Sequence, residues 1–346
     1  MKVYYSEAHR DHNPPFEIFE GGIQLPVFEC PERMDRILHS LRSAGWAEIL
    51  PPEDFGLEPI LAVHDADYVE YLRTAFDDWQ QEGGELGSQY TSPALIPSTF
   101  PPRRSRGKPK AIGARAGYYG MDLSAPIVGG TYRAAVESAH CAVSAAKAAS
   151  TGDRAAYALC RPPGHHAGRD YCGGYCYLNN ASIATRWLSS KGKVAILDID
   201  YHAGNGTQDI FYNSADVLTI SIHADPAHHY PSFVGYADET GDGAGRGFHH
   251  NFPLPAHTGD TEYLRTLDDA IALVRSFNPS TLVVSAGMDI YDGDPLGDFH
   301  VSADGIGEIG RRIARLDLPT VICQEGGYNN DALGENTVAL LSAFAS

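Results

Sequence analysis

Cysteines and long apolar runs are both scarce in this chain. Six cysteines are scattered over 346 residues, which is too few for a disulfide scaffold. Cys172 and Cys176 form one C-x3-C pair, which would hold zinc only with a second Cys/His pair, so we expect buried thiols there. No stretch approaches the roughly 18 consecutive apolar residues of a membrane span, and the first residues lack the apolar core of a signal peptide. We therefore expect a cytoplasmic protein that does not contact a membrane.

Basic residues are scarce as well. The chain has 26 Lys and Arg against 44 Asp and Glu, which gives a formal net charge of −18. This balance argues against nucleic acid and anionic membranes as partners, and it favours a small cationic substrate. The chain also lacks repeats, low-complexity runs and a linker between two self-sufficient halves, so residues 1–346 are expected to form a single domain.

Short apolar runs alternate with amphipathic or Ala-rich segments along the chain. The apolar runs predict strands buried on both faces, and the segments between them predict helices. The expected strands cover residues 2–5, 155–160, 194–199, 217–223, 282–289 and 320–328, and the expected helices cover 28–38, 64–72 and 132–149. This alternation predicts an α/β fold with a central, mostly parallel sheet and helices on both faces.

Residues 83–130 interrupt the alternation. The segment holds six prolines and a basic cluster of Arg103, Arg104, Arg106, Lys108 and Lys110. A loop this long inside a compact domain is usually functional or disordered. Because the rest of the chain is strongly acidic, the basic cluster can equally contact a second copy of the chain, which predicts a homodimer formed through this insertion.

The most informative motif follows the apolar run 194–199, where a single residue separates Asp200 from His202. On an extended chain these two side chains leave on the same side, as does Asp198, so they can share one cation. For an isolated D-x-H, a hydrogen-bonded pair that caps the strand is the more common explanation. That explanation weakens here because polar groups follow other expected strands too, namely His165, His166, Asp289 and Tyr328.

Together these groups provide what the hydrolysis of an amide requires. Two carboxylates and one imidazole form a three-ligand zinc site with an open position, which is typical of catalytic zinc. The cation would make bound water nucleophilic near neutral pH. A neighbouring imidazole would act as general base and then as general acid, and a phenol would hydrogen-bond the developing oxyanion.

Several long motifs make the chain resemble one family. They are RPPGHHAG (161–168), GGYCYLNN (173–180), ILDIDYHAGNGTQDIFY (196–212), SIHADP (221–226), SAGMDIYDGDPLG (285–297) and EGGY (325–328). In this order they resemble the zinc-dependent histone deacetylase superfamily, and within it the bacterial acetylpolyamine amidohydrolases. The resemblance implies a single-domain arginase/deacetylase-like fold. It also implies a zinc-dependent deacetylase of N-acetylated polyamines and diamines, of the acetylputrescine and acetylcadaverine type.

The resemblance further implies roles for particular residues. The ligands of one zinc per chain would be Asp200, His202 and Asp289. The catalytic residues would be His165, His166 and Tyr328, with Asp198 behind His165. A structural potassium would use the Asp198 carboxylate, the Ser221 hydroxyl and the main-chain oxygens of Asp200, His202 and Ile222. Substrate contacts would come from Tyr175, Gly174 and Asp122. Arg33, which composition alone assigns to the surface, would lie near the inner cavity through which acetate leaves.

Three positions depart from the family pattern. Ala203 stands where a second histidine usually follows the ligand, so the ligands are intact but support behind them is altered. Asn205 stands where many eukaryotic relatives have Asp behind the second tandem histidine. Because an amide cannot stabilise an imidazolium by charge, we expect His166 to have the lower pKa of the pair and to be the better base. Ser124 stands where one relative has an acidic residue that contacts substrate amines, and Asp122 is a nearby substitute.

Three alternative functions remain open at this stage. A deacetylase of acetyl-lysine peptides would use the same chemistry with a different tunnel mouth. An arginase-like ureohydrolase would need a dimanganese site, typically D-x-H-x-D, whereas Ala203 and Gly204 follow His202 here and no second ligand set is apparent. A catalytically inactive module that binds acyl chains is disfavoured, because the three ligands, both tandem histidines and Tyr328 are all present.

Overall fold

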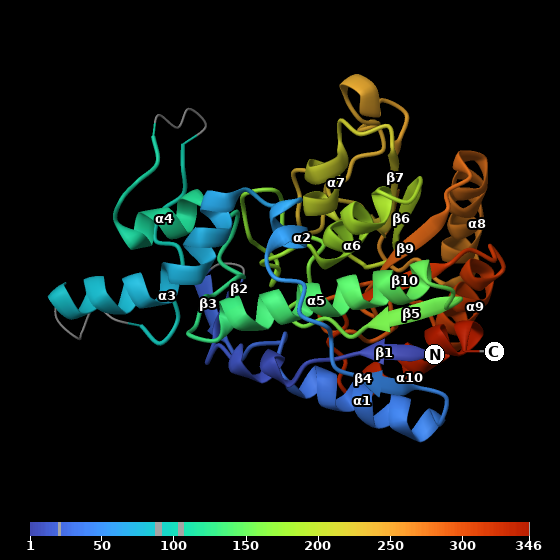
Figure 1. The fold of residues 1–346 in the computed structure, drawn as a ribbon, viewed down its shortest axis with the longest axis horizontal. Helices are drawn as coiled ribbons and strands as arrows, with labels where there is room; N and C mark the ends of the chain where they lie inside the picture. The colour runs from blue at the N-terminus through green and yellow to red at the C-terminus, as the bar shows by residue number, and fades with distance from the viewer. Residues whose placement is uncertain (20–21, 87–91, 103–106, 346) are drawn as a thin grey trace.

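A parallel sheet forms the centre of the protein (Figure 1). The computed structural model describes residues 1–19, 22–86, 92–102 and 107–345. Within these ranges the sheet has eight strands, all parallel. In spatial order they are β4 (Glu48–Leu50), β1 (Lys2–Tyr4), β5 (Ala155–Ala158), β10 (Thr320–Gln324), β9 (Thr281–Ala286), β6 (Val194–Asp198), β7 (Val217–Ala224) and β8 (His249–Leu254).

Helices cover both faces of this sheet. One face is covered by α2 (Glu58–Leu61), α3 (Ala66–Leu86), α4 (Ile112–Tyr118), α5 (Thr131–Ser150), α6 (Asn180–Ser189) and α7 (Asn205–Phe211). The other face is covered by α1 (Glu32–Ala44), α8 (Asp260–Phe277), α9 (Ala303–Ala314) and α10 (Leu333–Leu341). Short 3-10 turns lie at Glu7–Asp11, Gly243–Gly245 and Ser342–Phe344, and β2 (Glu17–Phe19) pairs antiparallel with β3 (Ile23–Leu25).

The strand sequences explain why both faces are covered. Successive side chains of a strand point to opposite faces of the sheet. In β6, Val194 and Ile196 pack into the core beneath α5 and α6, whereas Ala195 and Leu197 pack into the core beneath α8 and α9. A strand that is apolar at every position can bury both sides only in a sheet covered on both faces. The predicted fold class is confirmed, with all eight strands of the described sheet parallel.

Some elements were not predicted. The edge strand β4 is only three residues long, and β8 carries histidines and a proline, so neither shows an apolar run. The strands of the β2–β3 hairpin are also only three residues each, which is too short to show a pattern. The expectation of no regular pattern over 83–130 is wrong in two places. Helix α3 continues through Gly83 to Leu86, and α4 lies inside the insertion. In Figure 1 both helices lie at the opposite end of the molecule from the two termini.

The basic cluster of the insertion lies partly outside the described residues, since 103–106 are not described. Within the described part, the Lys108 ammonium donates to the Asp67 carboxylate of the same chain. At least one charge of the cluster is therefore compensated without a second copy of the protein.

Arg33 is buried, so the placement of this residue on the surface from composition was wrong. Its guanidinium is fully inaccessible to solvent and donates to Glu29 Oε1 at 2.8 Å and to the main-chain oxygens of Gly327 and Glu325 at 2.7 Å each. A buried charge needs such a complete set of partners. Arg33 consequently connects α1 to the loop that follows β10.

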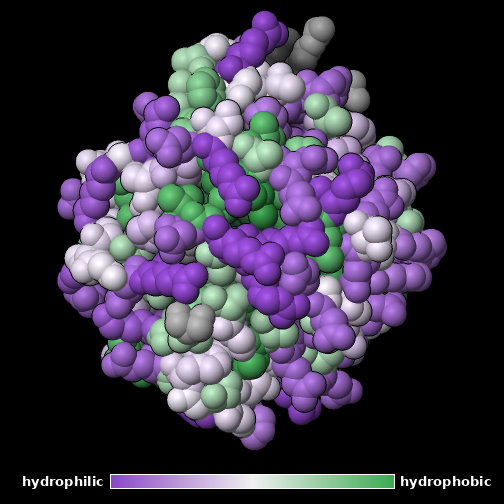
Figure 2. Space-filling model, turned by 90° about the vertical axis from the view of Figure 1, so that its right-hand side faces the viewer, coloured by the Kyte–Doolittle hydropathy of each residue, from purple (hydrophilic) through white to green (hydrophobic). Residues whose placement is uncertain are grey.

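The end of the molecule with α8, α9 and both termini is mainly hydrophilic (Figure 2). Apolar residues on this face are interspersed among polar ones, as expected for amphipathic helices whose apolar stripes face the sheet. In the described part of the chain, we find no helix that is both long and apolar enough to cross a membrane.

Candidate active site

The candidate site lies where three neighbouring strands end. Strands β6, β9 and β10 are adjacent and parallel, so their carboxyl ends open at the same edge of the sheet. Asp200 and His202 follow β6, Asp289 follows β9, and residues 325–328 follow β10. Ligand sites of open α/β sheets lie at such an edge. The structure therefore brings together the three predicted ligands from two segments of the chain.

The three predicted ligands form a compact group. One atom from each of Asp200, His202 and Asp289 lies within 4.8 Å of the other two. His202 Nδ1 is 3.3 Å from Asp200 Oδ1 and 3.2 Å from Asp289 Oδ2. Ligand atoms around a tetrahedral zinc ion are about 3.3 Å apart, given bonds of about 2.0–2.1 Å to nitrogen and oxygen. The spacing fits a metal ion of this size.

Two glycines leave room for this group. A Cβ on Gly287 would lie 2.0 Å from Asp200 Oδ2, and a Cβ on Gly326 would lie 2.2 Å from Asp289 Oδ2. The backbone also orients the carboxylates, because Gly326 N–H donates to Asp200 Oδ2 at 2.8 Å and Tyr201 N–H donates to Asp289 Oδ1 at 3.0 Å. Ligands held from behind in this way are preorganised for a metal.

The buried negative charges of this group also favour a bound cation. Asp200 and Asp289 are both fully buried. Burial, together with the charge of Asp200, raises the pKa of the Asp289 carboxyl to about 7. Two buried carboxylates so close together are costly unless a positive charge compensates them. The donor set of two carboxylates and one imidazole therefore suits a divalent metal with an open coordination position.

His165 is surrounded by carboxylates. Its Nδ1–H donates to Asp198 Oδ2 at 2.9 Å, and its Nε2 lies 3.6 Å from Asp200 Oδ1. Burial alone would lower the pKa of His165, but the charges of Asp200 and Asp198 outweigh burial and raise the pKa well above its usual value. His165 is thus stabilised as an imidazolium.

His166 has the opposite environment. Its Nδ1–H donates to Asn205 Oδ1 at 2.6 Å, and the Asn205 amide nitrogen faces the main-chain oxygen of His166. Burial, followed by the nearby imidazoles of His165 and His202, lowers the pKa of His166 well below its usual value. The expectation that His166 has the lower pKa of the pair is confirmed, but burial and the neighbouring imidazoles are the cause, since the hydrogen bond with Asn205 acts to raise the pKa. With Nδ1 protonated, Nε2 of His166 is the free acceptor.

Tyr328 is fixed through its backbone and its ring. Its N–H donates to Asp294 Oδ2 at 2.6 Å, and the Arg33 guanidinium lies 4.8 Å from the centre of its ring. Gly327, at φ +110°, makes the turn that precedes it, a conformation that favours glycine. Burial raises the pKa of the Tyr328 phenol well above its usual value, so the hydroxyl remains a hydrogen-bond donor.

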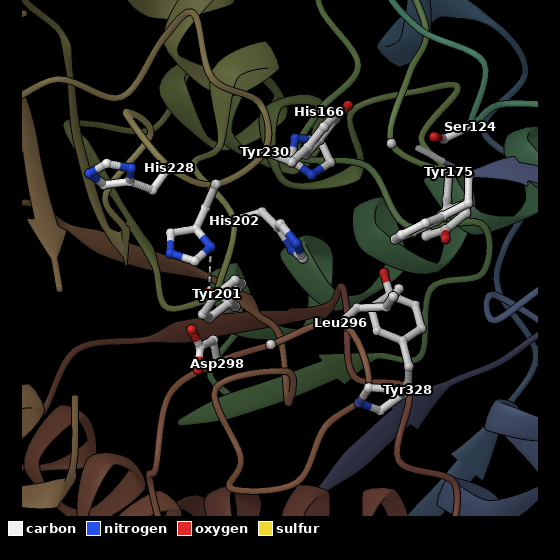
Figure 3. Close-up of a pocket in the computed structure, with 15 residues that line it drawn as sticks. Ser124, His166, Tyr175, Tyr201, His202, His228, Tyr230, Leu296, Asp298 and Tyr328 are labelled. Atoms are coloured by element: carbon white, nitrogen blue, oxygen red, sulfur yellow. Dashed lines mark hydrogen bonds between the residues drawn. The ribbon is translucent and has the colours of Figure 1, made fainter. Parts of the chain in front are cut away.

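A cavity of about 340 Å³ opens above these groups (Figure 3). His166, His202 and Tyr328 line it, and the rings of Tyr175 and Tyr230 form further parts of its wall. Tyr175 and Tyr328 have ring centres 5.7 Å apart, and the Tyr230 ring lies edge-on to His166 at 5.0 Å. Aromatic walls of this kind suit an aliphatic chain that leads to the polar groups.

Gly174 contributes space to this cavity. It has a φ of +51°, and a Cβ there would lie 2.3 Å from His166 Cδ2 and 2.8 Å from the Tyr230 hydroxyl. Any larger residue would therefore displace the proposed base. Gly174 and Tyr175 both line the cavity, as expected from the sequence for substrate contacts.

Asp122 contacts the cavity through a neighbour. Its Oδ2 accepts from the Tyr230 hydroxyl at 2.6 Å and from Gly174 N–H at 2.9 Å, and its Oδ1 accepts from Ser124 N–H at 2.9 Å. Ser124 is among the residues that line the cavity, whereas the Asp122 carboxylate supports Tyr230 behind it. Direct contact of Asp122 with substrate stays a prediction.

The predicted potassium ligands are neighbours in the sheet. Asp198 on β6 is paired with Ser221 on β7, and Ile222 follows on the same strand. Ser221 Oγ also lies 2.7 Å from His223 Nδ1. Because Asp198 and Ser221 are adjacent, both side chains can contact one cation. The binding of potassium stays a prediction.

The structure accounts for the alanine at position 203. Ala203 is buried, and the backbone of Gly235 approaches it so closely that a Cβ on Gly235 would lie 2.8 Å from Ala203 Cβ. The same Cβ would lie 2.8 Å from His223 Nε2, which is also 2.8 Å from Gly235 O. The Gly235 segment therefore occupies the space beside Ala203.

Sequence reasoning missed three residues that support the site. Tyr230 forms part of the cavity wall. Asp294 accepts from the backbone N–H groups of both Tyr328 and Asn329. Glu325 Oε2 accepts from the N–H groups of Gly164 and His165 at 2.7 and 3.1 Å. Asp294 and Glu325 lie inside motifs already noted, next to residues with an expected role. For Tyr230, the one available signal was its position directly before Pro231.

Comparison with known proteins agrees with this geometry. Residues 27–344 match the histone deacetylase domain. The chain belongs to the histone deacetylase family. The family assignment from sequence motifs is confirmed, and family membership makes the protein a hydrolase.

Individual relatives match this family member along its full length. Acetylpolyamine amidohydrolase 1 of Pseudomonas aeruginosa is 46% identical, with 99% of both chains covered. The acetylpolyamine amidohydrolase of Mycoplana ramosa is 40% identical over the whole of both chains. A crystal structure of acetylpolyamine aminohydrolase from Burkholderia pseudomallei superposes with a TM-score of 0.94 at 39% identity, and covers 100% of this chain and 99% of that chain.

Proposed function

We propose that the protein is a zinc-dependent amidohydrolase that removes acetyl groups from N-acetylated polyamines and diamines. The observation that carries this proposal is the buried group of Asp200, His202 and Asp289 at a cavity whose wall includes His166 and Tyr328. The full-length relatives named above support the same substrate class. Residues 1–346 would form one catalytic domain, with 83–130 as its insertion.

The chain's own residues would divide the work of amide hydrolysis. Zinc, when bound by the three ligands, would lower the pKa of a water molecule and polarise the acetyl carbonyl. His166 would take a proton from that water at Nε2 and later pass it to the leaving amine. The Tyr328 hydroxyl would donate to the carbonyl oxygen as negative charge develops on it. His165, whose Nδ1–H donates to Asp198, would be held in place beside the reacting atoms.

Metal retention tests the three ligands. Asp289→Ala is expected to abolish retention of zinc during dialysis, because it removes one of three ligands and leaves Asp200 buried beside His202. Elemental analysis of the dialysed protein measures this, with one equivalent expected in the unaltered chain. His39→Ala, on the exposed side of α1, is the matched control and should keep its zinc. A dialysed Asp289→Ala protein that retained a full equivalent would remove Asp289 from the site.

The charge of the chain supports a cationic substrate. A net charge of −18 gives a negative potential that raises the local concentration of amine cations. The aromatic walls at Tyr175 and Tyr230 suit a thin aliphatic chain better than a peptide backbone. The described part of the insertion borders the same cavity, since Tyr175 N–H donates to Ser124 O at 3.2 Å and Ser124 lines the cavity.

We therefore expect a higher kcat/KM for acetylputrescine than for an acetyl-lysine peptide. Added salt is expected to raise KM for the diamine more than it lowers kcat, because salt screens attraction between exposed charges. Steady-state kinetics on the zinc-loaded protein at several salt concentrations measures both the kcat/KM values and their salt dependence. If the peptide were the better substrate, the protein would be a general deacetylase with the same chemistry.

The insertion would also form a homodimer that narrows both cavity mouths. Phe100, in the described part of the insertion, is an exposed aromatic residue that a second copy would cover. Light scattering on the full chain tests this, with the mass of two chains expected and the mass of one contradicting it.

A further inference from the structure

A second histidine–carboxylate group lies at the surface near the cavity. His257, Asp298 and His300 each offer a ligand atom within 4.8 Å of the other two. His257 Nδ1 is 2.9 Å from Asp298 Oδ1, and the two imidazole rings have centres 4.9 Å apart. The Asp292 carboxylate borders this group, since its Oδ1 lies 3.9 Å from His300 Nε2.

The backbone holds these residues together. His257 N–H donates to Asp298 O at 2.8 Å, and His300 N–H donates to Thr258 O at 2.8 Å. Asp292 N–H donates to Val301 O at 2.9 Å, which connects the fourth residue to the same ladder. The side chains are accessible to solvent, with 67% of His257, 39% of Asp298 and 53% of His300 exposed. With the backbones hydrogen-bonded and solvent around the side chains, rotation of the side chains can bring the ligand atoms around an ion.

The types of ligand in this second group indicate which metal ion it would bind. Two imidazoles with one or two carboxylates suit zinc and similar borderline ions, whereas magnesium and calcium prefer oxygen ligands alone. Tetrahedral zinc needs ligand atoms about 3.3 Å apart, so the present spacing needs only small side-chain rotations. A hydrogen-bonded pair of His257 and Asp298 is the ordinary explanation for such a contact. It does not account for His300, which also offers a ligand atom within 4.8 Å of the other two.

We propose that His257, Asp298 and His300, assisted by Asp292, form a second, exchangeable Zn²⁺ site that regulates access to the cavity. Asp298 also lines the cavity, together with Leu296 and Tyr201 (Figure 3). An ion bound there cancels the negative charge of Asp298 on the cavity wall. A cationic substrate is then attracted less strongly. This regulatory effect rests on the proposed cationic substrate, whereas the metal site itself does not.

Zinc binding by the zinc-loaded, dialysed protein tests the site without any activity measurement. Titration with Zn²⁺ by calorimetry is expected to show one further equivalent, which binds more weakly than the retained ion because its ligands are exposed. The double variant H257A/H300A should lose this equivalent and keep the retained one. His39→Ala, which removes an exposed histidine elsewhere, should behave as the unaltered protein. Absence of the further equivalent in the unaltered protein, or its persistence in the double variant, would overturn the proposal.

Kinetics then tests the regulatory effect. Micromolar free Zn²⁺ is expected to raise KM for acetylputrescine several-fold with little change in kcat, and H257A/H300A should be insensitive to the added ion. An uncharged acetylated amine should show no rise in KM, since no charge is repelled. Zinc binding without any change in KM would refute regulation and leave a metal site alone. Failure of acetylputrescine as a substrate would instead count against the proposed function, which the calorimetry does not depend on.

Discussion

Replacing His166 with Ala is expected to lower kcat for acetylputrescine about 100- to 10,000-fold, the contribution typical of a general acid–base group. The reason lies in the protonation of the ring. Asn205 accepts the Nδ1–H, and burial lowers the pKa of the imidazole. Nε2 is therefore unprotonated and able to take a proton from water. Steady-state kinetics on the zinc-loaded variant measures the loss.

Two controls separate proton transfer from damage to the fold. Zinc content should be unchanged in His166→Ala, because the ring is not one of the three ligands, and added imidazole should restore part of the lost rate. His165→Ala should lower kcat less, since the carboxylate of Asp198, which accepts from Nδ1–H, favours the protonated form of His165 and makes it a poorer base than His166. A severe loss in His165→Ala alone would reverse the roles assigned to the two histidines.

Tyr328→Phe is expected to lower kcat about 100- to 1,000-fold, which is the loss typical of one oxyanion donor. The substitution removes a single hydroxyl group. The ring contacts with Arg33 and Tyr175 would remain, as would the backbone hydrogen bond to Asp294. The fold and the zinc content should therefore be preserved, and KM should change much less than kcat because the lost bond strengthens in the transition state.

Tyr175→Phe is the matched control for this variant. It removes a hydroxyl from the other tyrosine whose ring contacts Tyr328 in the cavity, and a much smaller loss of kcat is expected. Near-normal turnover by Tyr328→Phe, with zinc content intact, would exclude its hydroxyl from the mechanism.

The sequence by itself determined the parts of the protein that depend on local pattern. A run that is apolar at every position, such as 194–199, needs apolar surroundings on both faces, so the covered parallel sheet followed from it. Polar residues directly after several such runs must meet at one edge of that sheet. This position predicted that Asp200 and His202 share a cation, and the resemblance to the deacetylase family added Asp289 as the third ligand. The structure brings ligand atoms of all three within 4.8 Å of one another.

Tertiary structure alone decided the features that depend on partners far along the chain. In the sequence, Arg33 looks like a charged residue on the exposed face of a helix. In the structure it is buried and donates to the main-chain oxygens of residues 325 and 327. The sequence of β8 contains no apolar run, and this strand forms because its backbone pairs with β7 at the edge of the sheet. His257 joins Asp298 and His300 only because two separate segments form hydrogen bonds there. Local sequence carries no information about such partners, since each interaction forms only when the chain has packed.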